Sequence, residues 1–261
     1  MSQAGAIVGT EPSPRPRWPL PVPHDSTFAA AKPPYHNQVT VVAVPDAFVR
    51  GTSATVLGKH PPAWSLAIKR FMDLVLGSVA ILVILPLLCV VAIAIRLDSP
   101  GPVLYRSARV GRKGAVFTCY KFRTMRPHAD AAKQELRSRN ERQGAFFKIA
   151  DDPRITRLGR WLRRYSLDEL PQLWNVLRGD MSLVGPRPHP VDDVERYQVE
   201  DFQRLGFTPG ITGLWQITAR SDPSFQRCVA LDVDYINRWN LLLDFSILAR
   251  TLPVVLRGSG Q

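Results

Sequence analysis

One uninterrupted apolar stretch dominates the hydrophobic pattern of this chain. Residues Leu74 to Ile95 form a run of 22 positions without a charged side chain. A helix of that length would cover about 33 Å, at about 1.5 Å per residue, which is enough for the hydrocarbon core of a bilayer. We therefore predict a membrane-inserted helix over residues 63–98. A buried helix of a soluble protein is the alternative that this length disfavours.

Pro86 lies near the middle of the stretch and is expected to break it. Proline removes one hydrogen bond of a helix and usually kinks its axis. Both flanks are basic, with Lys69 and Arg70 on one side and five Lys or Arg residues between positions 96 and 113 on the other. Because basic flanks stay on the cytoplasmic face, both ends are expected on the same side of the membrane. The pattern favours a re-entrant helix, and a kinked span is the alternative.

A β-hairpin is predicted directly after this helix. Turn-forming residues at 98–102 end the helix. Two strand-like runs follow, Val103–Arg106 and Ala115–Lys121, and the turn Gly-Arg-Lys-Gly at 111–114 separates them. A polar helix from His128 to about Gln143 is expected next and would be exposed to solvent.

Two further helices are predicted between residues 156 and 178. The first begins at about Thr156 and places several guanidinium groups along one side; the arginines of this region are Arg154, Arg157, Arg160, Arg163 and Arg164. The second begins at Ser166, and apolar side chains at the helical period form its expected buried stripe: Leu170, Leu173, Trp174 and Leu177.

Asp168 and Glu169 lie at the start of this second helix, and the residues alone allow two interpretations. Ser166 and Glu169 have the spacing of a capping box, in which both side chains satisfy backbone donors. Pro171, however, suits the first helical position, which would move the cap to Leu170 and leave both carboxylates outside the helix. Adjacent carboxylates repel each other unless arginines or a divalent cation neutralise them. The nearby arginines make a functional pair reasonable.

A second unusual element is the sequence Gly-Pro-Arg-Pro-His-Pro at 185–190. Prolines on both sides of Arg187 restrict the backbone, so the guanidinium loses less entropy when it binds a phosphate. The alternative is a surface loop with an incidental arginine. His189 is interpreted as a loop histidine rather than a metal ligand.

The C-terminal third is expected to be mainly helical. A helix is predicted over Ser224–Trp239, with Asp232 and Asp234 on a partly apolar face. An amphipathic segment follows at Leu241–Leu256, interrupted by Asp244 and Arg250. It would rest on a membrane surface or form a terminal core helix, and it lacks the uncharged length needed to span a bilayer.

Composition narrows the classes of partner. The chain has 261 residues with 34 Lys and Arg against 22 Asp and Glu, an excess that favours nucleic acid, anionic lipid or phosphorylated molecules. Its three cysteines are far apart, so neither a disulfide framework nor a zinc site is indicated, and the catalytic part is expected in the cytoplasm. Prolines are concentrated in residues 1–62, which predicts a mostly disordered tail without a signal peptide and with at most a short strand near Val39–Val44.

Several motifs together resemble the monotopic phosphoglycosyl transferases, the bacterial sugar transferases that initiate exopolysaccharide, capsule and O-antigen synthesis. The resemblance runs from about Lys69 to Arg257. The motifs are Lys69-Arg70-x-x-Asp73 before the apolar segment, Tyr120-Lys121-Phe122-Arg123-Thr124-Met125, Asp152-Pro153-Arg154-Ile155-Thr156, Ser166-Leu167-Asp168-Glu169-Leu170-Pro171-Gln172-Leu173, Gly185-Pro186-Arg187-Pro188 and Pro209-Gly210-Ile211-Thr212-Gly213-Leu214-Trp215-Gln216. The chain departs from the family pattern at Leu85, where many members have serine before the proline.

The resemblance implies a two-step transfer of a sugar-1-phosphate from a UDP-sugar to polyprenyl (undecaprenyl) phosphate. Asp168 stands in the position of the nucleophile that forms a covalent aspartyl sugar-phosphate while UMP leaves. Glu169 stands in the position associated with Mg²⁺. The cations that resemble the substrate site are Lys121, Arg123, Arg163, Arg187 and, for the nucleotide sugar, Arg220. A carboxylate among such cations is expected to stay ionised, because positive neighbours lower its pKa.

These inferences give an expected α+β, helix-rich fold: a tail at 1–62, a membrane helix at 63–98 that includes Leu74, Pro86 and Ile95, and a compact cytoplasmic catalytic domain at 99–257. The expected location is the bacterial inner membrane. The expected partners are a UDP-sugar, polyprenyl phosphate and membrane lipids, with a further copy of the chain left open. A non-catalytic membrane scaffold is the alternative, and no nucleic-acid-binding motif is present.

Overall fold

The computed structural model describes residues 61–127, 129, 149 and 152–258. The predicted tail, apart from its last two residues, lies outside the described residues, as do the expected strand near Val39–Val44 and nearly all of the expected helix His128–Gln143. The described part mixes helices with two small sheets, in agreement with the predicted α+β class.

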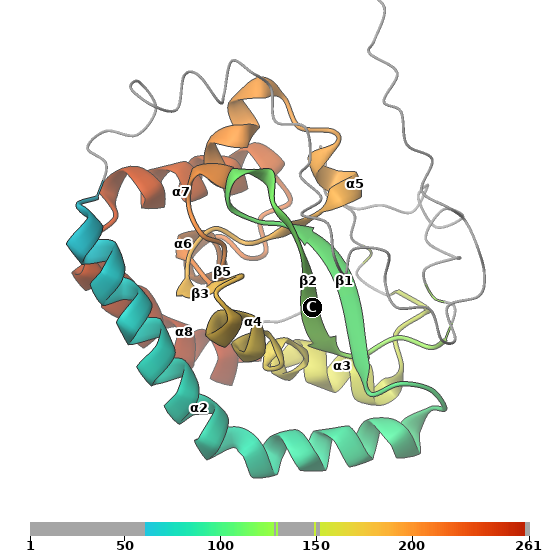
Figure 1. Ribbon diagram of the computed structural model, residues 1–261. Coiled ribbons are helices and arrows are strands. Elements are labelled where there is room, and N and C mark those ends of the chain that lie inside the picture. The colour runs from blue at the N-terminus through green and yellow to red at the C-terminus, as the bar shows by residue number, and fades with distance from the viewer. Residues whose placement is uncertain (1–60, 128, 130–148, 150–151, 259–261) are drawn as a thin grey trace, which may run out of the picture. The chain divides into compact units, whose positions relative to one another are not determined.

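The apolar stretch forms a single helix, α2, over Ala63–Asp98, with the predicted bounds. Pro86 lies inside it, and Figure 1 shows that the helix changes direction near its middle. It is the one helix in the described part of the chain that is long and apolar enough to cross a membrane. Only 11% of its most apolar 18-residue window is buried, whereas the core helix of a soluble protein would bury most of such a window.

The predicted hairpin is present, with longer strands than expected. Strands β1 (Leu104–Val110) and β2 (Val116–Phe122) pair antiparallel around a 3₁₀ turn, η1 (Arg112–Gly114). Strand β4 (His189–Pro190) adds to the other edge of β1, which gives the order β2-β1-β4. This sheet brings the Pro-rich segment beside the hairpin.

A second sheet pairs β3 (Ser182–Val184) with β5 (Gly210–Thr212) in parallel. The chain approaches itself closely at this point. A Cβ atom on Gly210 would lie 2.0 Å from the backbone nitrogen of Gly185, so only glycine fits there.

Three of the remaining helices begin where the sequence offers capping side chains. The helices α3 (Arg157–Arg164), α7 (Phe225–Arg238) and α8 (Leu241–Leu256) are capped by side chains of Thr156, Ser224 and Asn240. These three agree with the predicted helices within a residue. The other elements are η4 (Leu167–Glu169), α4 (Gln172–Arg178), α5 (Val191–Val194), η5 (Val199–Gly206) and α6 (Leu214–Thr218).

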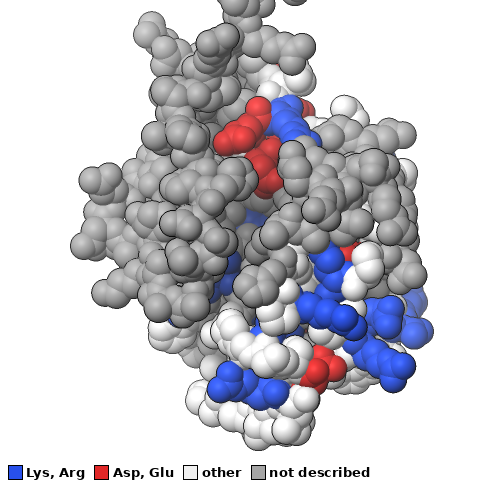
Figure 2. All heavy atoms as spheres, turned by 90° about the vertical axis from the view of Figure 1, so that its right-hand side faces the viewer, with Lys and Arg blue, Asp and Glu red and all other residues white. Residues whose placement is uncertain are grey.

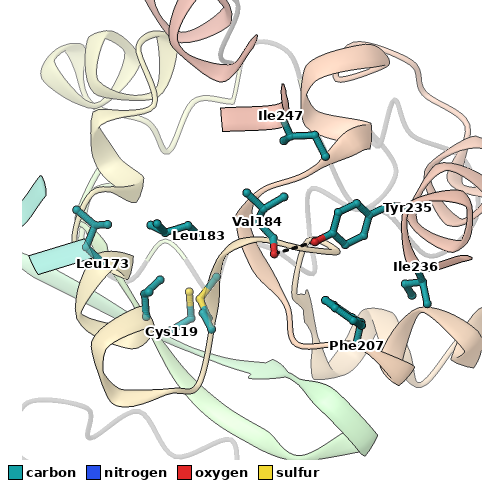
Figure 3. Close-up of a cluster of buried hydrophobic side chains, with 10 residues drawn as sticks. Cys119, Leu173, Leu183, Val184, Phe207, Tyr235, Ile236 and Ile247 are labelled. Atoms are coloured by element: carbon teal, nitrogen blue, oxygen red, sulfur yellow. Dashed lines mark hydrogen bonds between the residues drawn. The ribbon is translucent and has the colours of Figure 1, made fainter. Parts of the chain in front are cut away.

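The largest core cluster joins both sheets to the C-terminal helices (Figure 3). Cys119 of β2 and Leu173 of α4 lie on one side of Val184, and Tyr235 of α7 and Ile247 of α8 lie on the other. Helix α8 is therefore a core helix. Its opposite face nevertheless exposes large apolar side chains: Leu242, Phe245, Leu252 and Leu256.

The predicted buried stripe of α4 is partly wrong. Leu173 is buried, but Trp174 is 56% exposed, and the face that packs against β2 and α2 includes Asn175 and Val176 instead. The helix begins six residues later than Ser166, so the buried face falls on different positions than the sequence pattern suggested.

A buried ion pair joins α2 to α8. The Lys69 amino group lies 2.6 Å from Asp244 and 3.0 Å from the Val184 carbonyl oxygen. Asp244 also accepts from the Tyr235 hydroxyl at 2.8 Å and from the Trp239 indole at 3.2 Å. Paired in this way, two buried charges fix the first half of α2 against the end of the chain.

Candidate active site

The two adjacent carboxylates occupy a tight turn between α3 and α4. Ser166 has a left-handed backbone with φ 56°, and Asp168 and Glu169 follow in η4, both buried. Helix α4 then begins at Gln172 with Pro171 as its N-cap. The carboxylates thus lie outside the helix, as Pro171 suggested, although the cap falls one residue later than expected.

The capping-box interpretation is wrong. The Ser166 side chain makes no cap hydrogen bond, and its hydroxyl instead accepts from Arg220 at 3.0 Å. Of Glu169, it is the backbone N–H, not the side chain, that bonds to Ser166, donating to its carbonyl at 3.1 Å. Its carboxylate is therefore free to face other elements of the fold.

Glu169 is paired with two cations from separate parts of the chain. The Lys121 amino group of β2 lies 2.7 Å from Oε1, and Arg187 donates to Oε1 at 2.5 Å and to Oε2 at 3.2 Å. Burial alone would raise the pKa of Glu169, but Arg187 and Lys121 hold that pKa well below its usual range. Glu169 is therefore ionised throughout the physiological range.

Asp168 has the opposite electrostatic balance. Burial and the neighbouring Glu169 charge raise its pKa above the usual value, against the lowering effects of Lys121, Arg163 and Arg187. The nearby cations do lower the pKa of this residue, as expected, but burial and the Glu169 charge outweigh them, so the net shift is upward. The two carboxylates thus differ in protonation behaviour although they are adjacent in sequence.

Arg163 and Arg220 complete the group of cations around the carboxylates. The Arg163 Nε atom donates to the Thr124 hydroxyl at 2.9 Å, and its charge acts on both Asp168 and Glu169. The other arginines near α3 do not join them. Arg154 pairs with Asp152 at 2.6 Å, and the three that follow on α3 are exposed: Arg157, Arg160 and Arg164.

Arg123 occupies a different place from the one expected. Its guanidinium donates to the carbonyl oxygens of Ser99 and Pro100, both at 2.6 Å, and to that of Ile95 at 3.4 Å. These carbonyls lie at the C-terminal end of α2, where the last turn of a helix has no partners of its own. Arg123 therefore terminates α2 and is separate from the cations around Asp168.

The Pro-rich segment is buried rather than a surface loop. Gly185, Pro186 and Pro188 are buried, and Arg187 reaches Glu169 from this fixed backbone. His189 is also buried, with its Nδ1 against the Tyr197 hydroxyl, and burial lowers its pKa well below the usual range. The interpretation of His189 as a loop histidine is wrong, because β4 carries it into the core.

No cluster of three or more His, Cys, Asp or Glu side chains suited to a metal ion occurs among the described residues. Asp168 and Glu169 still fit a Mg²⁺ ion of the kind that is held by one or two carboxylates together with substrate phosphates. Both Glu169 oxygens already accept from cations, so such an ion would have to replace or share these contacts.

Comparison with known protein families identifies the domain that contains this site. A family model described as bacterial sugar transferase matches residues 64–258. The chain belongs to this family. The matched region begins with α2 and includes both sheets and every helix described here, so the carboxylate turn and the cations around it lie within the bacterial sugar transferase domain.

Three similar proteins come from bacteria. The galactosyl transferase CpsE of Streptococcus agalactiae serotype III is 47% identical over 197 residues, which are 75% of the chain and 43% of the relative. The undecaprenyl-phosphate galactose phosphotransferase of Salmonella typhimurium is 43% identical over 74% of the chain and 41% of the relative. The exopolysaccharide production protein ExoY of Rhizobium meliloti is 41% identical over 74% of the chain and 87% of the relative. The chain thus matches less than half the length of the first two.

Sequence reasoning missed several residues that shape the sugar transferase site. Asn175, fully buried, joins α4 to β2 through hydrogen bonds to Tyr120 and Thr118. Arg204, also buried, pairs with Asp232 beneath the Arg187 segment. Of these residues Asp232 gave a signal, because an acid on a partly apolar helix face indicates a buried partner.

Proposed function

We propose that this chain transfers a sugar-1-phosphate from a UDP-sugar to a polyprenyl phosphate. One observation carries the proposal: a buried carboxylate, Asp168, lies among three cations that face both it and Glu169, namely Lys121, Arg163 and Arg187. Transfer at phosphorus requires positioning and neutralisation of negative charge, and fixed cations supply both. The names of two relatives, a galactosyl transferase and an undecaprenyl-phosphate galactose phosphotransferase, support the same reaction class.

In the first step an Asp168 oxygen attacks the phosphorus that carries the sugar. The bond from that phosphorus to the bridging oxygen breaks, and UMP leaves with that oxygen. In the second step a phosphate oxygen of the polyprenyl phosphate attacks the same phosphorus and breaks its bond to Asp168. The aspartate is restored as a carboxylate, and the product is a polyprenyl diphosphate linked to the sugar.

The contacts of each cation indicate which part of the substrate it would bind. Arg187 and Lys121 are positioned by Glu169 and face the carboxylate pair, so they suit the diphosphate charge. Arg220 binds the hydroxyl of Ser166, directly before the pair, and suits the nucleotide-sugar side. A Mg²⁺ ion held by Glu169, with Asp168 beside it, would supply further neutralisation of the diphosphate.

The membrane part of the proposal rests on α2 and on the basic surface near it. Lys and Arg side chains gather on the lower part of the face in Figure 2, and most of the acidic side chains visible there lie higher. Basic surfaces attract phosphorylated head groups. We place the catalytic domain on the cytoplasmic face of the bacterial inner membrane, with α2 as a re-entrant anchor bent at Pro86.

Asp168→Asn tests the chemistry. The variant keeps the shape of the side chain but removes the nucleophile, so we expect UMP release to fall to background in membranes supplied with UDP-sugar, polyprenyl phosphate and Mg²⁺. Asp234→Asn, at an exposed acid on α7, is the matched control and should retain full turnover. Equal turnover in both variants would remove Asp168 from the reaction. An inactive wild type against a panel of UDP-sugars would instead favour a scaffold.

Cysteine labelling tests the topology of α2. The exposed Cys89 is first replaced by alanine, and single cysteines are then introduced at Ala63 and Asp98, the exposed ends of the helix. A re-entrant helix predicts that a membrane-impermeant reagent labels both from the cytoplasmic side only. Labelling of the two ends from opposite sides would establish a span.

A further inference from the structure

The backbone around Arg187 is held by side chains from four other elements. The Val184 carbonyl accepts from Lys69 at 3.0 Å and from the Tyr235 hydroxyl at 3.2 Å, the second of which is drawn in Figure 3. The Arg187 carbonyl accepts from Arg204 at 2.7 Å. The Pro188 carbonyl, next in the chain, accepts from the Arg109 guanidinium at 3.1 Å. Three of these four donors are cationic.

The prolines explain why the segment depends on outside donors. Pro186, Pro188 and Pro190 have no backbone N–H, so alternate residues cannot donate to a neighbouring strand. Hydrogen bonds to its carbonyl oxygens therefore contribute much of what fixes the segment, beside the one that the Gly185 N–H donates to the Thr212 carbonyl at 2.9 Å. A charged donor makes a stronger hydrogen bond than a neutral one, and the Arg187 carbonyl has such a donor in Arg204.

Arg204 is built into the core for this contact. It is 1% exposed, and its guanidinium donates through Nε to Asp232 at 3.0 Å and through Nη1 to the Tyr197 hydroxyl at 2.7 Å. The Nη2 atom donates both to Asp232 and to the Arg187 carbonyl. Burying a guanidinium is costly unless its charge is paired, and Asp232 pairs it. These bonds leave the planar group one orientation.

We propose that Arg204 is a positioning residue for Arg187. It acts through the Arg187 main chain. Asp232 and Tyr197 orient the Arg204 guanidinium, which fixes the Arg187 carbonyl. The Arg187 side chain therefore reaches Glu169 from a fixed backbone. The inference rests on the proposed function, in which Arg187 neutralises the diphosphate. It adds a buried layer behind the site that touches neither the carboxylates nor the substrate.

The test is Arg204→Lys, which keeps the charge but cannot bind Asp232, the Tyr197 hydroxyl and the Arg187 carbonyl together. A small displacement of a reacting group lowers rates by up to about 100-fold, so we expect kcat to fall roughly 10- to 100-fold. KM for the UDP-sugar should change far less, because Arg187 acts mainly on charge that develops during transfer. Arg238→Lys is the matched control, since Arg238 forms an exposed ion pair with Asp234 on α7 and should lose no activity.

Coupling to Arg187 separates positioning from a general structural effect. In an Arg187→Lys background the further change Arg204→Lys should lower kcat by no more than about twofold. The rate losses of two substitutions multiply when the sites are independent and do not when the sites are coupled. Tyr197→Phe removes only one hydroxyl from the network and should lower kcat by less than Arg204→Lys does. Rate losses that multiply fully in the double variant would overturn the proposal.

Side-chain NMR provides a readout that does not require activity. In protein labelled with ¹⁵N-arginine, the Nε–H signal of Arg187 is assigned by its loss in Arg187→Lys. Arg204→Lys should shift or broaden that signal, and Arg238→Lys should leave it unchanged. An unmoved Arg187 signal in folded Arg204→Lys protein would refute positioning, whereas an inactive wild type with a shifted signal would refute only the proposed function.

Discussion

Asn175 offers a test of how the fold holds the carboxylate turn against the hairpin. Its side-chain oxygen accepts from the Tyr120 N–H at 3.0 Å, and its amide donates to the Thr118 carbonyl at 2.7 Å. Both groups belong to β2, which is an edge strand of its sheet among the residues that the structure describes. Asn175 therefore takes the place of a neighbouring strand beside Tyr120, the residue directly before Lys121.

The expected cost of Asn175→Ala follows from these two bonds. Each buried backbone group left without a partner costs about 1–3 kcal/mol, and both β2 groups are only partly buried, so we expect a loss of about 2–4 kcal/mol in the free energy of unfolding. For a domain of this size, about 2–4 °C of midpoint shift accompanies each kcal/mol, which gives a fall of roughly 5–15 °C.

Thermal unfolding in detergent micelles, followed by tryptophan fluorescence, measures this loss. Asn237→Ala, at an exposed position of α7, is the matched control and should change stability by no more than about 0.5 kcal/mol. A midpoint for Asn175→Ala within the error of the control would refute the reasoning, because it would show that water replaces both hydrogen bonds at no cost.

Three further changes have defined outcomes. Gly159→Ala would place a Cβ atom 2.1 Å from a backbone oxygen, so it should destabilise the fold by more than about 1 kcal/mol in the same unfolding assay; unchanged stability would contradict the tight contact. Lys121→Gln removes a charge that lowers the pKa of Asp168, so this pKa should rise. The acid limb of kcat/KM for sugar-phosphate transfer should then move to higher pH. An unmoved limb would exclude Asp168 as the group titrated. Asp244→Asn removes the carboxylate that forms the ion pair with buried Lys69 and should cost about 3–5 kcal/mol in thermal unfolding, and Lys69→Met in the same chain should recover part of that loss. A double variant no more stable than the single one would show that the buried charge is not the cause.

Local patterns in the sequence predicted most of the longer elements. The bounds of α2, α7 and α8 and the presence of the hairpin follow from apolar periodicity, from turn residues and from capping side chains such as Ser224. These signals act within a few residues of each other, so the sequence expresses them directly. The start of α4 was misplaced because Ser166 and Glu169 match a capping box by spacing, while their side chains bind Arg220 and Lys121 instead.

The candidate site was predicted in its membership but not in its electrostatics. The motifs singled out Asp168, Glu169, Lys121 and Arg187, and the structure brings these four together. The same reasoning assigned Arg123 to the phosphate site, whereas the fold directs its guanidinium to the end of α2. Lys121 and Arg123 are both cations of the same motif, two positions apart, so the sequence pattern alone cannot distinguish their roles.

The sequence by itself determined the long apolar helix, the family and the carboxylates of the candidate site. Tertiary structure decided which cation pairs with which acid, and hence that the pKa of Glu169 is lowered while that of Asp168 is raised. The reason is physical: a pKa depends on burial and on charges within a few ångströms, and Lys121 and Arg187, separated from Glu169 by 48 and 18 residues, come within that distance only when the chain is folded.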